Sequence, residues 1–387
     1  MQLSFFTETQ KKNFLFSGNY FFYFLVLGVY FPYFPLYCYK IGFSEKEVGM
    51  ISGLRTFASI FFPLGWAFLV DRFHLHRFIF LFCHTLAVAA WSLFFFADTF
   101  FFMMFIMGLY GFFHSPIIGF MEAFTVNFLG KKKSGYGGIR VWGSVGFIFS
   151  VWGCGFLLDF WPSRTVLWLV LSGSLVGVWM ALKTPVSTTG GLLLNRGGLH
   201  RLLTGNGLLF LFIAFVMVMS HGAYYGFFSI HLSEAGFSGS FIGFTWALAS
   251  LAEIVVMLGF RRIFKRFSLK KMMLFSLVMA VIRWLLLAFS IHPLVILFSQ
   301  ILHAFTYGVF HMAAILFMDA LVDPGAKTLG QTLLNATSYG VGLMMGYVIG
   351  GLGFASLGEG MFVISALMAL VGGGCAVILQ NPESSVP

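Results

Sequence analysis

The sequence predicts an all-α integral membrane protein, with twelve transmembrane helices arranged as two pseudo-symmetric six-helix bundles. Three observations predict this fold. Of the 387 residues, 59% are hydrophobic and only 9% are charged, whereas about a quarter of the residues in a soluble domain are charged. Apolar runs of about 20 residues, the length needed to cross a bilayer, are separated by eleven short breaks. Finally, local sequence features recur at one offset on the two sides of the midpoint.

The breaks are short clusters of glycine, proline or charged residues. The first apolar run begins after Lys12 and continues to about Tyr39 without a small-residue cleavage pattern, so we interpret it as a spanning helix and not as a removed signal peptide. The breaks that define the other helices lie near residues 41–46, 71–77, 97–98, 130–136, 159–164, 184–204, 232–240, 260–271, 290–293, 320–328 and 355–360.

The basic residues indicate the orientation. Eighteen of the 23 lysines and arginines fall at the termini or in the even-numbered breaks, and three fall in the odd-numbered ones. Arg55 and Arg283 remain for the membrane itself. Because cytoplasmic loops of membrane proteins carry an excess of lysine and arginine, both termini are expected in the cytoplasm. We expect a multi-pass protein of a bacterial inner membrane.

The longest break divides the chain into two related halves. Gly42-Phe43-Ser44 with Gly49 reappears as Gly236-Phe237-Ser238 with Gly243, an offset of 194 residues. We therefore expect an N-terminal six-helix bundle at 1–183, a cytoplasmic central linker at 184–204 and a C-terminal six-helix bundle at 205–387. Two six-helix halves in parallel repeat are the architecture of the major facilitator class of transporters.

The segment GWAFLVDRFHLHR, after the second predicted helix, resembles the loop signature of that superfamily. Gly65, Asp71, Arg72 and Arg77 fit the pattern, while Phe73 stands where it has glycine. In the second half Arg266 corresponds to Arg72. An acid beside basic residues at helix ends can pair in one of two conformations, so we expect these residues to take part in conformational gating. The alternative is a charge cluster that only sets the topology.

Several ionisable residues lie within the predicted helices. Because such groups cost at least ~2.5–3.5 kcal/mol each at membrane depth, they usually line a cavity and find partners. By helix rise, Arg283 lies about 18 Å above the cytoplasmic Lys271, a depth that His303 shares. Glu253 lies a few ångström nearer the cytoplasm, within reach of a long arginine. The residues of this kind are Arg55, Glu122, Glu253, Arg283, Asp319, His221, His303 and His311.

Longer segments resemble the phenylpropionate permease group, in the lactose-permease-like branch of the superfamily. They are YGGIRVWGSVGF at 136–147, SHGAYYGFFSIHL at 220–232, LAEIVVMLGFRRIFKRF, VIRWLLLAF and PLVILFSQILHAFTYGVFHMAA. The resemblance implies symport, with aromatic acids among the group's substrates. It also implies that Glu122 and Arg140, 18 residues apart as in lactose-type members, form a substrate-binding pair. Phe147 stands where those members carry a tryptophan that stacks on sugar, which weakens a sugar assignment.

The resemblance also implies where a proton would be handled. Lactose-type members place an arginine, a histidine 20 residues later and a glutamate three residues after that. Arg283 and His303 keep the first spacing, but Thr306 occupies the position of the glutamate. Threonine does not carry a proton, so the titrating group of a proton-coupled carrier would be Glu253 or Glu122. A glutamate whose arginine neighbour comes and goes during the transport cycle would bind and release a proton.

Several alternatives remain open at this point. Arg283 and Glu253 could form a purely structural ion pair, since breaking a buried pair is destabilising whatever its purpose. Arg55 could bind an anion or pair with another residue. His221, Tyr224 and Tyr225 are candidate substrate-binding residues, or they belong to a helix crossing made possible by Gly222 and Gly226. The other candidate substrate-binding residues are Tyr20, Tyr23 and Tyr307.

The sequence contains no pattern typical of an enzyme. A phosphate-binding loop, a nucleophile triad and clustered metal ligands are all absent from it, and the four cysteines are scattered in apolar segments. We expect no cofactor and no nucleic-acid partner. The predicted function is secondary transport of a small organic solute, an aromatic acid or a sugar-like molecule, coupled to protons, by a monomer in membrane lipid. The alternatives are a proton-independent facilitator or exporter, and a membrane sensor that transports nothing.

Overall fold

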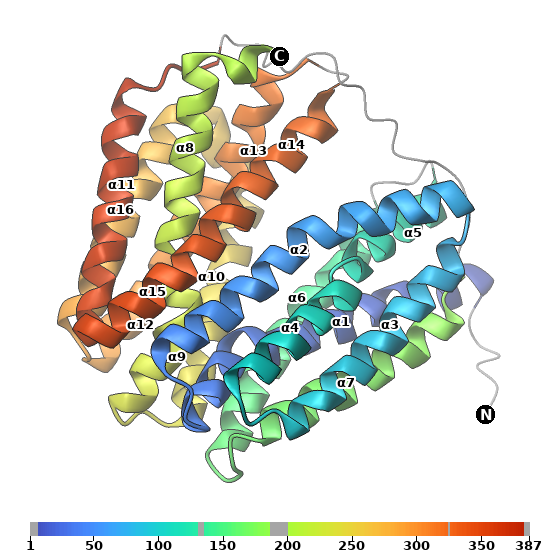
Figure 1. The fold of residues 1–387 in the computed structure, drawn as a ribbon. Coiled ribbons are helices and arrows are strands. Elements are labelled where there is room, and N and C mark those ends of the chain that lie inside the picture. Colours follow the sequence, from blue (N-terminus) through green and yellow to red (C-terminus); the bar gives the residue numbers. More distant parts are fainter. Residues whose placement is uncertain (1–6, 131–134, 186–199, 324–325, 383–387) are drawn as a thin grey trace. The chain divides into compact units, whose positions relative to one another are not determined.

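The computed structural model describes residues 7–130, 135–185, 200–323 and 326–382, and these residues are almost entirely helical (Figure 1). The helices of the first half are α1 Glu8–Lys40, α2 Glu45–Phe73, α3 His76–Ser92, α4 Phe100–His114, α5 Ile117–Leu129, α6 Tyr136–Leu158 and α7 Thr165–Lys183. Those of the second half are α8 Gly205–Ser220, α9 Gly222–Glu234, α10 Gly239–Arg266, α11 Leu269–Phe289, α12 Pro293–His303, α13 Phe310–Leu321, α14 Lys327–Asn335, α15 Leu343–Leu357 and α16 Met361–Ile378.

The described residues contain eleven apolar helical runs that are long enough to cross a membrane. The last run, Lys327–Ile378, has 52 residues, about 78 Å of helix against a hydrocarbon core of about 30 Å. Gly358, with φ of +55°, turns the chain between α15 and α16, so this run makes two passes. The prediction of an all-helical transmembrane fold is confirmed.

Some spans are interrupted along their length. One break lies between α4 and α5, where Pro116 follows Ser115, and another lies between α8 and α9 at His221. The tenth and eleventh spans each contain a π-helix, η4 Ala304–Val309 and η6 Ala336–Gly342. π-Helical turns are rare and occur frequently at functional sites, so these two segments mark the second half for closer inspection.

Two compact units divide the chain. One contains residues 1–41, 57–191 and 238–243, and in it α1 packs along α6 and α7 while α3 packs against α4 and α7. The other contains residues 42–56, 192–237 and 244–387, and in it α11 packs along α16 while α15 packs against α8 and α9. Most of the predicted linker at 184–204 lies outside the described residues. The two predicted bundles therefore remain a prediction.

Close backbone contacts explain the two short exchanged pieces. In the second unit the start of α2 lies against α15, and a Cβ on Gly351 would lie 2.6 Å from the carbonyl oxygen of Glu45. In the first unit the start of α10 lies against α6, where Gly239 approaches the backbone of Gly155. The Asp159 carboxylate accepts a hydrogen bond at 3.0 Å from the backbone N–H of Ser240. An acidic group is favourable at a helix N-terminus.

Helix ends near the short loops repeat the pattern of the sequence offset. Gly42 and Gly236 both have positive φ, +104° and +82°, conformations that favour glycine. At the start of α3, Arg77 donates two hydrogen bonds to the last carbonyls of α7, at 2.9 Å to Thr184 and 2.8 Å to Leu182. At the start of α11, Lys270 donates one to Val377 of α16 at 2.6 Å. The two halves thus fix their last helices in the same way.

Candidate functional site

A buried arginine organises the polar interior of the second unit. Arg283 on α11 is 0% exposed, although an arginine at this depth is costly unless its charge is compensated. Its Nε donates to the Ser299 carbonyl at 2.9 Å, and the rest of its guanidinium reaches α12 and the π-helix η4. The rings of Tyr224 and Trp284 lie 4.1 and 4.6 Å from the guanidinium carbon. The charge is therefore surrounded by acceptors and aromatic faces.

His303 connects this arginine to a carboxylate. One guanidinium nitrogen of Arg283 lies 2.8 Å from Nδ1 of His303, and Nε2 of the same ring lies 2.8 Å from Oε1 of Glu253 on α10. An arginine only donates hydrogen bonds, so Nδ1 must be the acceptor and carries no hydrogen. The imidazole is therefore neutral, with its hydrogen on Nε2, where it donates to Glu253.

This geometry refines the expected contact between Arg283 and Glu253. Depth along the helices predicts that the two side chains meet, but the structure places the imidazole between them. His303 cannot become an imidazolium while Arg283 occupies Nδ1. Glu253 is the more accessible group, with its side chain 20% exposed against 5% for His303. Of these three residues, only Glu253 is free to exchange a proton.

Neutral polar residues complete the shell around Arg283. The Gln300 side-chain oxygen accepts hydrogen bonds from the Tyr224 hydroxyl at 2.8 Å and from Arg283 at 3.4 Å. Thr306 lies 3.4 Å from both Arg283 and Nε2 of His221, whose Nδ1 donates to the Met217 carbonyl at 2.9 Å. At the position where a glutamate was expected from the resemblance, Thr306 thus satisfies neighbouring donors and acceptors.

The predicted substrate-binding aromatics of this unit have different surroundings. His221 and Tyr224 are buried within the shell of Arg283, whereas Tyr225 and Tyr307 are half-buried and line a cavity of about 10 Å³ together with Tyr339. The helix crossing considered as an alternative is also present. Gly222 on α9 meets Gly346 on α15 with backbone against backbone, so this segment has a packing role as well.

In the first unit, Arg140 lies on an aromatic surface. Its guanidinium carbon is 4.0 Å from the ring centre of Phe24 and 5.5 Å from that of the buried Tyr20. In the described part of the chain, no ion pair within 4.0 Å joins it to Glu122, which is exposed on α5. Phe147, half-buried, lies two turns further along α6. The half-buried guanidinium of Arg140 thus keeps hydrogen-bond donors available for an anion.

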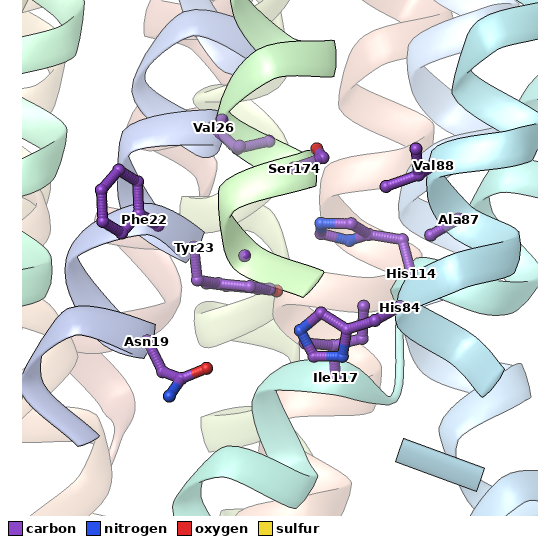
Figure 2. Close-up of a pocket in the computed structure, with 12 residues that line it drawn as sticks. Asn19, Phe22, Tyr23, Val26, His84, Ala87, Val88, His114, Ile117 and Ser174 are labelled. Carbon is purple, nitrogen blue, oxygen red and sulfur yellow. The ribbon is translucent and has the colours of Figure 1, made fainter. Parts of the chain in front are cut away.

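A second polar cavity lies inside the first unit, with a volume of about 30 Å³. Figure 2 shows the rings of His84, His114 and Tyr23 and the amide of Asn19 around this space. Tyr23 stacks on His114 with ring centres 5.2 Å apart. His84 donates from Nδ1 to the Phe80 carbonyl at 3.0 Å. The volume suffices for one or two water molecules.

The candidate gating residues lie at the ends of α2, α3 and α10. Arg72 and Arg266 are exposed, and Asp71 belongs to α2. A Cβ on Gly65 would meet no atom within 4 Å among the described residues, so close packing does not explain that glycine here. Arg77 holds the end of α7, as described above. Arg55, on α2, is buried, with 7% of its surface exposed.

Comparison with known proteins identifies the family. A model of the MFS_1 like family matches residues 14–364. The chain belongs to this family. It is 26% identical over 363 residues to the "Probable 3-phenylpropionic acid transporter" of Escherichia coli strain K12, covering 91% of this chain and 94% of that protein. It is 21% identical over 337 residues to the nucleoside permease NupG of the same organism, covering 80% of this chain and 79% of that protein.

Solved structures show the same fold. The crystal structure of the nucleoside transporter NupG matches with a TM-score of 0.84 at 17% identity, over 95% of this chain and 98% of that one. The resemblance to major facilitator transporters is therefore confirmed. This MFS_1 like protein is a multi-pass membrane protein and a secondary transporter of a small molecule, and it is not an enzyme.

Several site residues escaped the sequence interpretation. Gln300, Tyr339, His84 and His114 each interrupt an apolar run, as in LFSQILH and GFFHSPI. The cost of placing a polar group at membrane depth, applied to every such residue and not only to charged ones, would have identified all four.

Proposed function

We propose that this MFS_1 like protein is a proton-coupled symporter of aromatic carboxylates. In this proposal it works as a monomer in the lipid of a bacterial inner membrane, with both termini cytoplasmic and the two six-helix bundles alternating access to a midplane site. Arg77, Arg72, Asp71, Gly65 and Arg266 would hold one end of that cycle. The cytoplasmic linker at 184–204 would join the bundles.

The observation that carries the proton coupling is the arrangement of Arg283, His303 and Glu253. A neutral imidazole of fixed tautomer passes the influence of a buried guanidinium to a carboxylate that remains accessible. When Glu253 binds a proton, the carboxyl group loses its attraction to that charge and the contact with His303 weakens. Movement of this contact during the cycle would therefore couple protonation to conformation.

The aromatic carboxylate follows from the surroundings of the two arginines. Arg283 is fully buried and its donors are occupied by protein acceptors, so it does not bind the substrate. Arg140 keeps donors available beside two aromatic rings. A guanidinium binds a carboxylate through paired hydrogen bonds, and Phe24 and Tyr20 offer ring faces for an aromatic body. The relative named for 3-phenylpropionic acid supports this class of substrate.

The test is uptake into proteoliposomes with an imposed acid-outside gradient. Radiolabelled 3-phenylpropionate should accumulate above its external concentration, and a protonophore should abolish the accumulation. Radiolabelled uridine serves as the competing probe. Uptake of uridine in place of 3-phenylpropionate would contradict the substrate class, and equilibration of 3-phenylpropionate independent of the gradient would instead indicate a facilitator.

A further inference from the structure

A row of protonatable side chains continues from His303 towards the end of α13. His303, Tyr307 and His311 follow at intervals of four residues, which places them on one face. Their rings stack with centres 5.4 and 5.7 Å apart and interplanar angles of 21° and 10°. Asp319 lies eight residues beyond His311, so the row extends about 24 Å by helix rise. Under the predicted topology this end faces the cytoplasm.

His311 and His303 differ in their hydrogen-bond partners. Nδ1 of His303 faces an arginine, which only donates. Nδ1 of His311 lies 2.8 Å from the hydroxyl of Tyr339 in the π-helix η6. A tyrosine hydroxyl can donate or accept. It can therefore donate to the neutral imidazole and, after rotating, accept a hydrogen bond from the imidazolium. His311 can carry a proton in a position where His303 cannot.

Charged and titratable groups surround the row from every packed element. Glu253 faces it from α10 and Arg283 from α11, while His221 and Tyr225 face it from the junction of α8 and α9. At the far end, Asp319 lies 3.5 Å from Lys327 and accepts a hydrogen bond at 2.8 Å from Gln331. Asp319 and Lys327 are 34% and 47% exposed at their side chains. Only this end of the row meets the surface.

We propose that His311, with Tyr339 as a partner that switches from donor to acceptor, carries the proton between Glu253 and the surface near Asp319. This inference rests on the proposed proton coupling and adds its route. In the step that releases the proton, the Glu253 O–H bond breaks and an N–H bond forms on His311. The imidazolium then returns to neutral by giving a proton to water near Asp319. Tyr307, between the two histidines, aligns this transfer.

The proposal concerns the rate of proton transfer and not the affinity of Glu253 for its proton. The experiment is a rapid pH change applied to the purified full-length protein in proteoliposomes. Infrared absorption of the Glu253 carboxyl group, identified by its loss in Glu253→Gln, reports protonation without any transported substrate. His311→Phe should slow protonation of Glu253 roughly ten-fold or more, with the equilibrium midpoint little changed. Tyr339→Phe should slow it less, because the imidazole remains.

Controls separate the route from general damage. His84→Phe replaces a buried histidine in the other unit and should leave the rate unchanged. His311→Gln, which keeps a polar side chain but does not carry a proton, should be as slow as His311→Phe. Wild-type rates in both His311 variants would overturn the proposed route while leaving Glu253 as the proton-binding group. A Glu253 carboxyl group that does not titrate in the wild type would overturn both the route and the proton coupling.

Discussion

The attraction between Arg283 and Glu253 through the His303 ring can be measured directly. Two contacts of 2.8 Å and the width of an imidazole separate the charges, roughly 7 Å, which at an effective dielectric constant of about 20 corresponds to about 2 kcal/mol. The loss of a directly paired buried charge costs more, about 3–5 kcal/mol. Glu253→Gln alone does not isolate this term, since it also removes the cost of burying a carboxylate.

A double-mutant cycle with Arg283→Gln isolates the coupling. The assay is equilibrium unfolding in mixed detergent micelles, followed by tryptophan fluorescence for the wild type, both single variants and the double variant. We expect a coupling of about 2 kcal/mol where Glu253 is ionised, and loss of the coupling as acidification protonates Glu253. The exposed Glu8, 3.4 Å from Lys11, provides the control, with an expected coupling below about 1 kcal/mol. A coupling between 253 and 283 no larger than this control, or one unaffected by pH, would refute the relayed pair.

Three other substitutions test separate parts of the account. Gly346→Leu should destabilise the protein by roughly 1–3 kcal/mol, because its side chain would enter the backbone of Gly222. Gly374→Ala, where a Cβ meets nothing within 4 Å, should not, and equal unfolding midpoints for the two variants would contradict the crossing. Arg77→Gln should loosen the end of α7 at a cost of about 1 kcal/mol, seen as faster hydrogen exchange there than in the wild type; unchanged exchange would argue against this anchor. Arg140→Lys, which keeps the charge but loses paired donation, should weaken 3-phenylpropionate binding about ten-fold in a calorimetric titration, with unfolding unchanged, and wild-type affinity would remove Arg140 from the site.

Sequence reasoning located the elements well because hydropathy and the cost of buried charge act on one residue at a time. The helix breaks, the depth of Arg283 and the 20-residue spacing to His303 all follow from composition and helix rise. Depth does not fix rotation about the helix axis. For that reason the imidazole between Arg283 and Glu253, and the position of Arg140 over Phe24 without a close contact to Glu122, required coordinates.

Residues without formal charge were harder to assign. Tyr339 is one tyrosine among 13, and its role near His311 depends on two π-helical segments that no hydropathy pattern predicts. The cavity beside His84 and His114 is formed by helices distant in sequence. Gly346 could be assigned to packing in advance because small residues at intervals of four permit close helix contact, and the structure confirms that contact.

The central claim is that Glu253 binds the coupled proton, and transport by Glu253→Gln in proteoliposomes tests it most directly. The variant should exchange 3-phenylpropionate in counterflow, which needs no net proton movement, at a rate near that of the wild type. It should fail to accumulate this substrate under an acid-outside gradient. Accumulation by Glu253→Gln equal to that of the wild type would contradict the account.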